Sequence, residues 1–169
     1  NGEIINTLEI TRTHNGDLNN FFGKTSNLNY VRIYVPFGSQ LISAQNFEEV
    51  PPEAFEEPEE HWQTDEHLQN IQGEVWVDPN TGTFINNEFN KTVFGNWEQV
   101  DPGETKTFIF KYRLPITLNL TTTEDRFSLF DSKSQSGFHS LFWQKQAGQQ
   151  NTTYNLKFNL PYAINSGWT

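Results

Sequence analysis

Apolar and polar side chains alternate most regularly between residues 105 and 114. This period-two pattern is typical of a β-strand that buries one face and exposes the other. A second β-prone stretch, residues 91–100, precedes it, and we expect its Gly-Asn pair to break the strand. Asp101-Pro102-Gly103-Glu104 lies between the two stretches and is a strong turn signal. We therefore predict a β-hairpin over residues 91–115, with Pro115 ending the second strand. The side chains expected to face the core are Phe108, Phe110, Tyr112 and Leu114.

The same alternation recurs in short runs along the rest of the chain. In residues 30–35, Val31 and Ile33 share one face while Tyr30 and Arg32 share the other. Such runs predict strands at 3–14, 30–35, 40–44, 73–77, 83–85, 116–120, 138–146 and 152–160. Many short strands separated by turns are typical of a β-sandwich. We therefore predict an all-β fold, a single antiparallel β-sandwich domain over residues 1–169 that is either immunoglobulin-like or jelly-roll-like.

Three polar stretches are predicted as loops, at residues 15–29, 121–125 and 131–137. The first contains two adjacent aromatic residues, Phe21 and Phe22. Because large apolar side chains are usually buried, we expect these two rings to form a hydrophobic plug beneath the loop.

Residues 48–72 differ from the rest of the chain because Glu and Asp are crowded there around several prolines. Like charges at this density repel one another, so the main hypothesis is a long, solvated loop insertion in the sandwich. This acidic insertion is also the only segment whose sequence suggests a helix.

An alternative hypothesis for the acidic insertion is a Ca²⁺ site, since Ca²⁺ takes several carboxylate oxygens as ligands. The carboxylates proposed for it are Glu59, Glu60, Asp65 and Glu66. The insertion lacks the Asp-rich loop motif of EF-hand proteins. His61 and His67 suggest a transition metal, but their spacing is not the i, i+4 that places two imidazoles on one helix face. Exposed loop histidines are the simpler interpretation.

Composition and charge exclude several classes of protein. Hydrophobic residues make up only 34% of the chain, but 15% are aromatic, which favours a folded domain with polar loops over disorder. The net charge of −10 disfavours nucleic acid and anionic membrane surfaces as partners. The absence of Cys excludes disulfides and thiolate metal sites. No run resembles a membrane helix or a signal peptide, so we expect any anchor or export signal to lie outside these residues.

Three phrases follow one another in a recognisable order: NYVRIYVPFGSQLISAQNF at 29–47, KTVFGNWEQVDPGETKTFIFKYRLP at 91–115 and HSLFWQKQAGQQNTTYNLKFNLP at 139–161. Together they resemble the C-terminal β-domain of a family of large bacterial envelope proteins of unknown function (domain of unknown function four-zero-one-two). The resemblance implies an extracellular or cell-surface domain on a membrane-anchored bacterial protein, with no established activity and no catalytic residues to transfer. The acidic insertion departs from that pattern, and so does Ala147-Gly148, where the family favours Pro-Gly. The insertion leaves open whether this chain has a ligand of its own.

No local signature of catalysis accompanies these features. The sequence lacks G-x-S-x-G, HExxH, P-loop and GxGxxG motifs. The carboxylates of the insertion also lack the fixed separation that glycoside hydrolysis needs. We therefore predict that the chain is not an enzyme and has no cofactor apart from the hypothetical Ca²⁺. The expected role is a structural or interaction module that contacts neighbouring domains or other envelope proteins, without membrane insertion of its own.

The alternative function is carbohydrate binding through exposed aromatic side chains, with Ca²⁺ as a stabilising ion. The residues proposed to stack on sugars are Trp62, Trp76 and Trp97. Burial in the core is the commoner role of a tryptophan. Trp62 lies in the acidic insertion, so we expect it to be the most exposed of the three.

Overall fold

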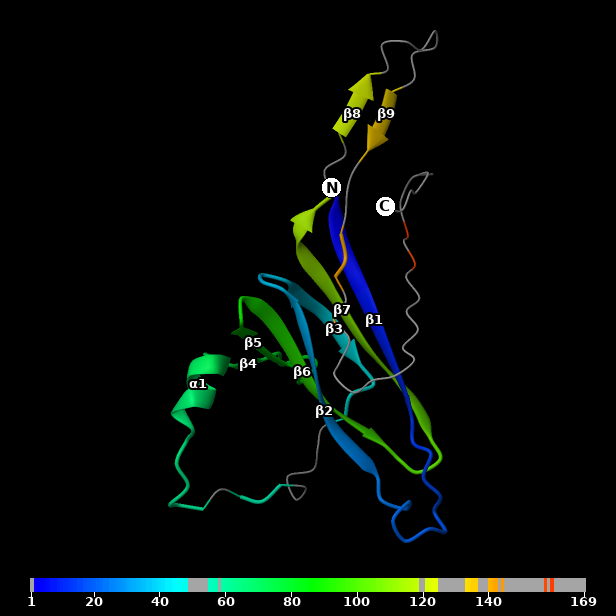
Figure 1. Cartoon of the computed structure of the whole chain (residues 1–169), viewed down its shortest axis with the longest axis vertical. Coiled ribbons are helices and arrows are strands. Elements are labelled where there is room, and N and C mark those ends of the chain that lie inside the picture. Colours follow the sequence, from blue (N-terminus) through cyan, green and yellow to red (C-terminus); the bar gives the residue numbers. More distant parts are fainter. Residues whose placement is uncertain are drawn as a thin grey trace. The chain divides into compact units, whose positions relative to one another are not determined.

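The computed structural model describes residues 2–48, 55–57, 59–118, 121–124, 133–136, 140–142, 144, 157 and 159 (Figure 1). The chain divides into two compact units, Asn1–Gly137 and Phe138–Thr169. The helix and the strands of the described residues all belong to the first unit. The strands predicted at 138–146 and 152–160, and the single domain over 1–169, stay predictions, because most of the second unit lies outside the described residues.

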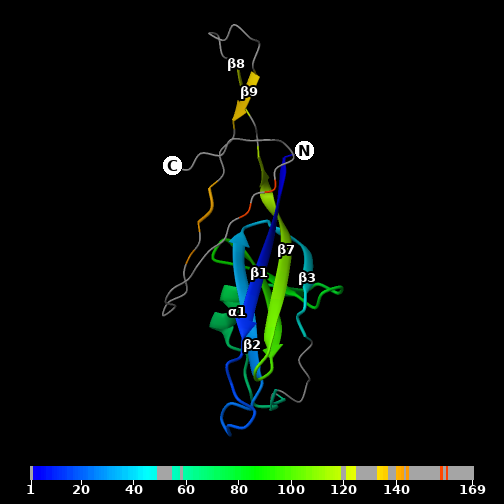
Figure 2. The same cartoon turned by 90° about the vertical axis from the view of Figure 1, so that its right-hand side faces the viewer.

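The described residues of the first unit form two larger antiparallel sheets, which confirm the predicted all-β sandwich, and a separate two-stranded sheet of β8 and β9. A three-stranded sheet has the strand order β1-β7-β3, and a four-stranded sheet has the order β2-β6-β5-β4. Figure 2 shows β1, β7 and β3 side by side. The elements are β1 (Glu3–Thr13), β2 (Asn27–Pro36), β3 (Gln40–Gln45), α1 (Glu66–Gln72), β4 (Trp76–Val77), β5 (Phe84–Glu88), β6 (Lys91–Val100), β7 (Thr105–Thr117), β8 (Thr121–Glu124) and β9 (Lys133–Ser136).

The core lies between the two sheets. Its buried residues are Val35, Phe94, Phe110, Tyr112 and Leu114. The rings of Phe94 on β6 and Tyr112 on β7 lie 5.8 Å apart, so the contact joins the two sheets. The predicted inward face of β7 is confirmed, with Phe108 and Phe110 fully buried. Burial of each such side chain contributes about 1.5–3 kcal/mol to stability.

The predicted hairpin over residues 91–115 is wrong, because β6 and β7 belong to different sheets. The turn itself forms as expected: Glu104 N donates to Asp101 O at 3.0 Å, and Gly103 has a φ of 81°. It passes the chain from one layer to the other. Phe94 of β6 and the inward aromatic face of β7 are buried against each other across the sandwich rather than within one sheet.

Three local predictions about strand ends are also wrong. β6 runs unbroken through Gly95, where the missing side chain leaves room for the Tyr30 ring. β7 continues through Pro115, near a shift in its register with β1 that accommodates a residue without an N–H. β8 and β9 pair where polar loops were expected. The sequences TTTE and KSQS are polar at every position, so they show no alternation to detect, although the Thr residues of β8 favour strands.

Candidate functional site

The acidic insertion, residues 48–72, connects the end of β3 in one sheet to β4 in the other. We call it the acidic arm. Its start is fixed to β7: the Phe47 ring lies 4.6 Å from the Phe110 ring, and Asn46 Nδ2 donates to Thr107 O at 2.6 Å. Glu48 Oε1 pairs with Lys106 Nζ at 2.5 Å, and this hydrogen bond raises the pKa of Lys106. The arm therefore begins at a defined point on the sandwich.

Helix α1 forms the last part of the arm, and local chemistry sets its two ends. Asp65 caps the N-terminus, where its Oδ1 accepts hydrogen bonds from His67 N at 2.8 Å and Leu68 N at 3.2 Å. Glu66 in the first turn interacts favourably with the helix dipole. Gly73, with a φ of 60°, ends the helix and donates its N–H to Gln69 O at 2.8 Å. The expectation that only the acidic insertion would contain a helix agrees with the described residues.

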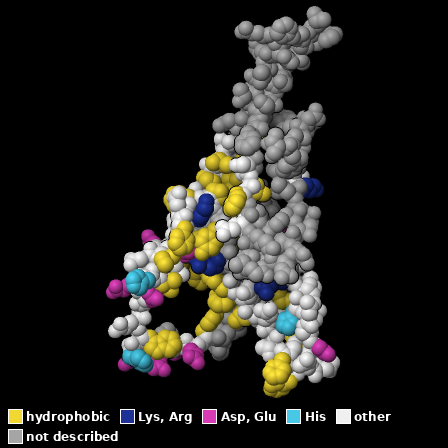
Figure 3. Space-filling model, in the orientation of Figure 1, with side chains coloured by type: hydrophobic (Ala, Val, Ile, Leu, Met, Phe, Trp, Pro, Cys, Tyr) yellow, Lys and Arg dark blue, Asp and Glu magenta, His cyan; other side chains and the backbone are white. Residues whose placement is uncertain are grey.

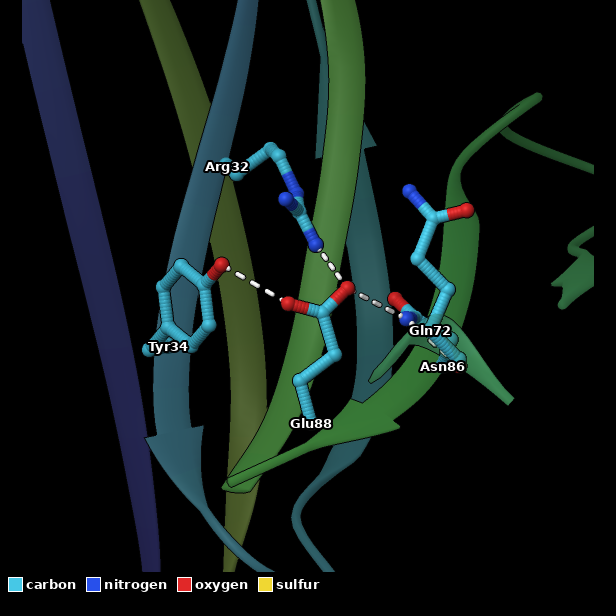
Figure 4. A network of polar contacts seen from close by, with 5 residues as sticks. All are labelled: Arg32, Tyr34, Gln72, Asn86 and Glu88. Atoms are coloured by element: carbon cyan, nitrogen blue, oxygen red, sulfur yellow. Dashed lines mark hydrogen bonds and ion pairs between the residues drawn. The ribbon is translucent and has the colours of Figure 1, made fainter. Parts of the chain in front are cut away.

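A buried carboxylate lies on the outer face of the four-stranded sheet, the face turned away from the three-stranded sheet (Figure 4). Glu88 on β5 is only 3% exposed. Its Oε1 forms an ion pair with Arg32 Nη2 and accepts a hydrogen bond from Asn86 Nδ2 at 2.8 Å. Its Oε2 accepts from Tyr34 Oη at 2.9 Å. Both carboxylate oxygens are therefore satisfied by side chains of β2 and β5.

These partners determine the protonation state of the network. Burial alone would raise the pKa of Glu88, but hydrogen bonds from Asn86, Tyr34 and Arg32, together with the Arg32 charge, hold that pKa below its usual value of 4.5. The pKa of Tyr34 is raised, first by burial and then by the hydrogen bond that it donates to Glu88. At neutral pH, Glu88 is therefore ionised and Tyr34 keeps its proton.

The network reaches the acidic arm through Asn86. The same Nδ2 that donates to Glu88 also donates to Gln72 O at 2.9 Å, at the C-terminal end of α1. A side-chain amide nitrogen carries two hydrogens, and both are used here. In Figure 1, α1 lies beside this outer face. The carboxylate thus orients an amide that holds the helix.

An aromatic cluster covers another part of the outer face. The Tyr30 ring lies 4.9 Å from the Trp97 ring and 6.0 Å from the Phe84 ring. Phe55, from the acidic arm, lies 5.0 Å from Trp97. Gly95 makes this cluster possible, because a Cβ at that position would collide with the Tyr30 hydroxyl. Burial raises the pKa of Tyr30.

The structure does not bring the three predicted sugar-stacking residues together. Trp62 and Trp76 are 52% and 55% exposed, and neither lies in a ring pair with another described aromatic residue. Trp97 is half-buried between Tyr30 and Phe55. Their role in binding stays a prediction, and Trp97 is the one that lies within an aromatic cluster.

The four carboxylates proposed for Ca²⁺ are exposed and are not gathered around one point. Asp65 is engaged as the N-cap of α1, and Glu59 Oε2 lies 3.3 Å from His61 Nδ1. Within the part of the chain that the structure describes, no group of three or more His, Cys, Asp or Glu side chains could hold a metal ion. Glu60 and Glu66 thus do not combine with these residues into a ligand set.

The predicted hydrophobic plug is wrong, because Phe21 and Phe22 are 73% and 89% exposed. Their rings form an edge-to-face pair at 5.3 Å, and Lys24 lies over the Phe21 ring at 5.1 Å. Consecutive turns close the loop through its own polar groups, as in the 2.9 Å bond from Asn20 N to Asp17 O. The loop therefore forms without apolar burial of these rings.

A second buried carboxylate, Glu98 on β6, lies between the two sheets and is 1% exposed. Its Oε1 pairs with Arg12 of β1 and accepts from Asn29 Nδ2 at 3.0 Å. Its Oε2 has no hydrogen-bond partner among the described residues. This ion pair joins the two layers of the sandwich.

Sequence reasoning missed Asn86 and Glu88 because the predicted strand ended at residue 85. The alternation continues to residue 88, so the side chains of Asn86 and Glu88 lie on the same face of the strand as Phe84. Tyr34 and Arg32 were placed on one face, but no partner was assigned to them. Arg32 on β2 and Glu88 on β5 lie on two strands separated by β6, so no direct cross-strand pair signalled their contact.

Comparisons of this chain with protein-family models, with curated proteins and with solved structures found no match. The resemblance to the bacterial envelope family therefore stays a prediction. No helix in the described part of the chain has the length and apolar character needed to span a membrane.

Proposed function

We propose that this chain is a non-catalytic, extracytoplasmic structural or interaction module of a bacterial cell-envelope protein. One observation carries the proposal: the acidic arm is fixed to the sandwich at both ends, while its described Asp and Glu side chains are exposed. Figure 3 shows carboxylates, in magenta, and histidine side chains, in cyan, at the lower left of the view, where Figure 1 places the arm. Such an arrangement displays negative charge on a segment whose two ends are attached to the sandwich.

A fixed arm suits an interaction module for two physical reasons. Attachment at both ends removes part of the conformational entropy that a free loop would lose on binding. A concentrated negative charge also steers association with partners of complementary charge. The partners proposed are neighbouring domains of the same protein or other envelope proteins. The envelope location is supported by the three family-like phrases at 29–47, 91–115 and 139–161.

Proteolysis of intact cells tests this proposal. Glu-specific protease added to bacteria that produce the full-length parent protein should cleave within the arm, because exposed loops are preferred sites of cleavage. A matched variant with every Glu of residues 49–66 changed to Gln, which keeps the Glu48–Lys106 pair, should resist cleavage between those residues. A parent protein that stays intact until the cells are lysed would overturn the extracytoplasmic location.

Carbohydrate binding is the second candidate, and the Tyr30–Trp97 ring pair on the outer face favours it. Titration of a glycan panel, followed by tryptophan fluorescence, should then give a saturable change that Trp97→Ala abolishes. A Ca²⁺ titration of the melting temperature tests the stabilising ion, because a ligand of the native state must raise that temperature. Flat responses in both titrations would remove this candidate.

A further inference from the structure

We propose that Glu88 and Asn86 form a latch that holds helix α1 against the outer face of the four-stranded sheet, and that the latch is closed only while Glu88 is ionised. Closed means that the hydrogen bond from Asn86 Nδ2 to Gln72 O is formed. The inference goes beyond the proposed function, since it concerns how the acidic arm is attached rather than what the arm contacts.

The first argument is that every partner of Glu88 is a donor. Arg32, Asn86 and Tyr34 direct an N–H or O–H toward the two carboxylate oxygens. A protonated Glu88 would place its own hydrogen against one of these donors. It would also leave the Arg32 charge without its counter-charge. Protonation therefore removes the arrangement that orients the Asn86 amide.

The second argument is that α1 has little else to hold it. The helix is seven residues long and buries none of its residues. Its apolar side chains Leu68 and Ile71 are 50% and 45% exposed. Isolated helices of fewer than about 12 residues are marginal in water. The bond from Asn86 to the last carbonyl of the helix therefore carries a large share of its attachment.

The sign of the pH effect follows from Glu88. Its pKa is lowered in the folded state, so its stabilising contribution is fully present above the usual value of 4.5 and is lost as pH falls through the folded value. The elements beside Glu88 carry other charged groups. Arg32 and Tyr34 lie on β2, Lys91 on β6 and Glu66 and His67 on α1. His67 lies on the helix itself, so the test must separate its effect from that of Glu88.

Pulsed dipolar spectroscopy on the whole chain tests the latch, and the absence of Cys allows clean labelling. Spin labels at Gln69→Cys on α1 and Thr7→Cys on β1 should give one narrow distance distribution at pH 7. Glu88→Gln should broaden it at the same pH. In the labelled chain with an unsubstituted Glu88 network, lowering the pH below about 4.5 should broaden the distance distribution. This broadening should occur with or without His67→Gln.

Glu98→Gln is the matched control, because it alters the other buried carboxylate–arginine pair without touching α1. It should leave the distribution narrow at pH 7. Asn86→Ala keeps the Arg32–Glu88 pair and removes the Asn86 bonds to Gln72 O and to Glu88 Oε1, so it should broaden the distribution even if Glu88→Gln fails to fold. Narrow distributions in Asn86→Ala and in any folded Glu88→Gln would overturn the latch. Equal broadening in Glu98→Gln would also overturn it.

Discussion

Glu98 and Glu88 are two buried carboxylates of the same sheet that face opposite sides of it. Glu98 faces inward and pairs with Arg12 of the other sheet, so it joins the two layers. Glu88 faces outward and pairs with Arg32 of its own sheet, and Asn86 extends its network to α1. The structural role of a buried ion pair therefore depends on which elements the other hydrogen bonds of its network contact. One supports the sandwich, and the other supports the arm.

Arg12→Ala should give the largest effect among the variants of the two ion pairs, because it leaves the inward carboxylate buried with Asn29 as its only described partner. Removing one member of a buried pair costs about 3–5 kcal/mol, and the partial exposure of Arg12 places this variant at about 3 kcal/mol. Urea unfolding measures the loss in the free energy of unfolding. Arg113→Ala is the control, since its pair with Glu3 at 3.3 Å is partly exposed and contributes about 0–1 kcal/mol. Equal losses in the two variants would contradict the role of Glu98.

Gly95→Ala should destabilise the outer aromatic cluster by about 1–3 kcal/mol, because the new Cβ would displace the Tyr30 ring from Trp97 and Phe84. Urea unfolding and the tryptophan emission spectrum measure the change. In a double-mutant cycle with Tyr30→Leu, the combined loss should be smaller than the sum of the single losses. If the two losses in the free energy of unfolding simply add, the effect of Gly95→Ala does not come from displacing the Tyr30 ring.

Tyr34→Phe should lower the free energy of unfolding by about 1 kcal/mol, because Glu88 Oε2 loses the hydrogen bond from the hydroxyl while the half-exposed site admits water. The loss should shrink as pH falls, since protonated Glu88 no longer needs that donor. Urea unfolding at pH 7 and in acid measures both quantities. If the loss in the free energy of unfolding is the same at every pH, the contribution of Tyr34 does not depend on the ionisation of Glu88.

Phe22→Ser should have the smallest effect, within about 0.5 kcal/mol, because the ring is 89% exposed and supports neither ion pair. Thermal unfolding beside the parent chain measures it. Phe110→Ala, which removes a fully buried ring, is the contrasting variant and should lose about 3–5 kcal/mol. A comparable loss in Phe22→Ser would mean that the loop does bury this ring.

The sequence predicted which faces of the strands are apolar, but not which strands become neighbours. The inward face of β7 and the division of β2 into two faces followed from period-two alternation, a local property. The separation of β6 from β7 did not, because pairing depends on which apolar faces meet across the core. Arg12 and Glu98 are 86 positions apart, so no local pattern could join them.

The candidate site shows the same limit. The shared face of Tyr30, Arg32 and Tyr34 was predicted from alternation, but their partners Asn86 and Glu88 lie beyond where the strand was predicted to end. The acidic insertion was predicted as a solvated loop from its charge. Its attachment through Gln72 could not be predicted, because a backbone carbonyl carries no sequence signal.

Hydrogen exchange of Asn86→Ala at neutral pH tests the central claim most directly. The claim is that the outward network supports the arm while the inward one supports the sandwich. Exchange should accelerate in residues 66–73, including the Gly73 amide bonded to Gln69 O, and stay slow in β6 and β7. Unchanged exchange in residues 66–73, or acceleration spread over β6 and β7, would contradict the account.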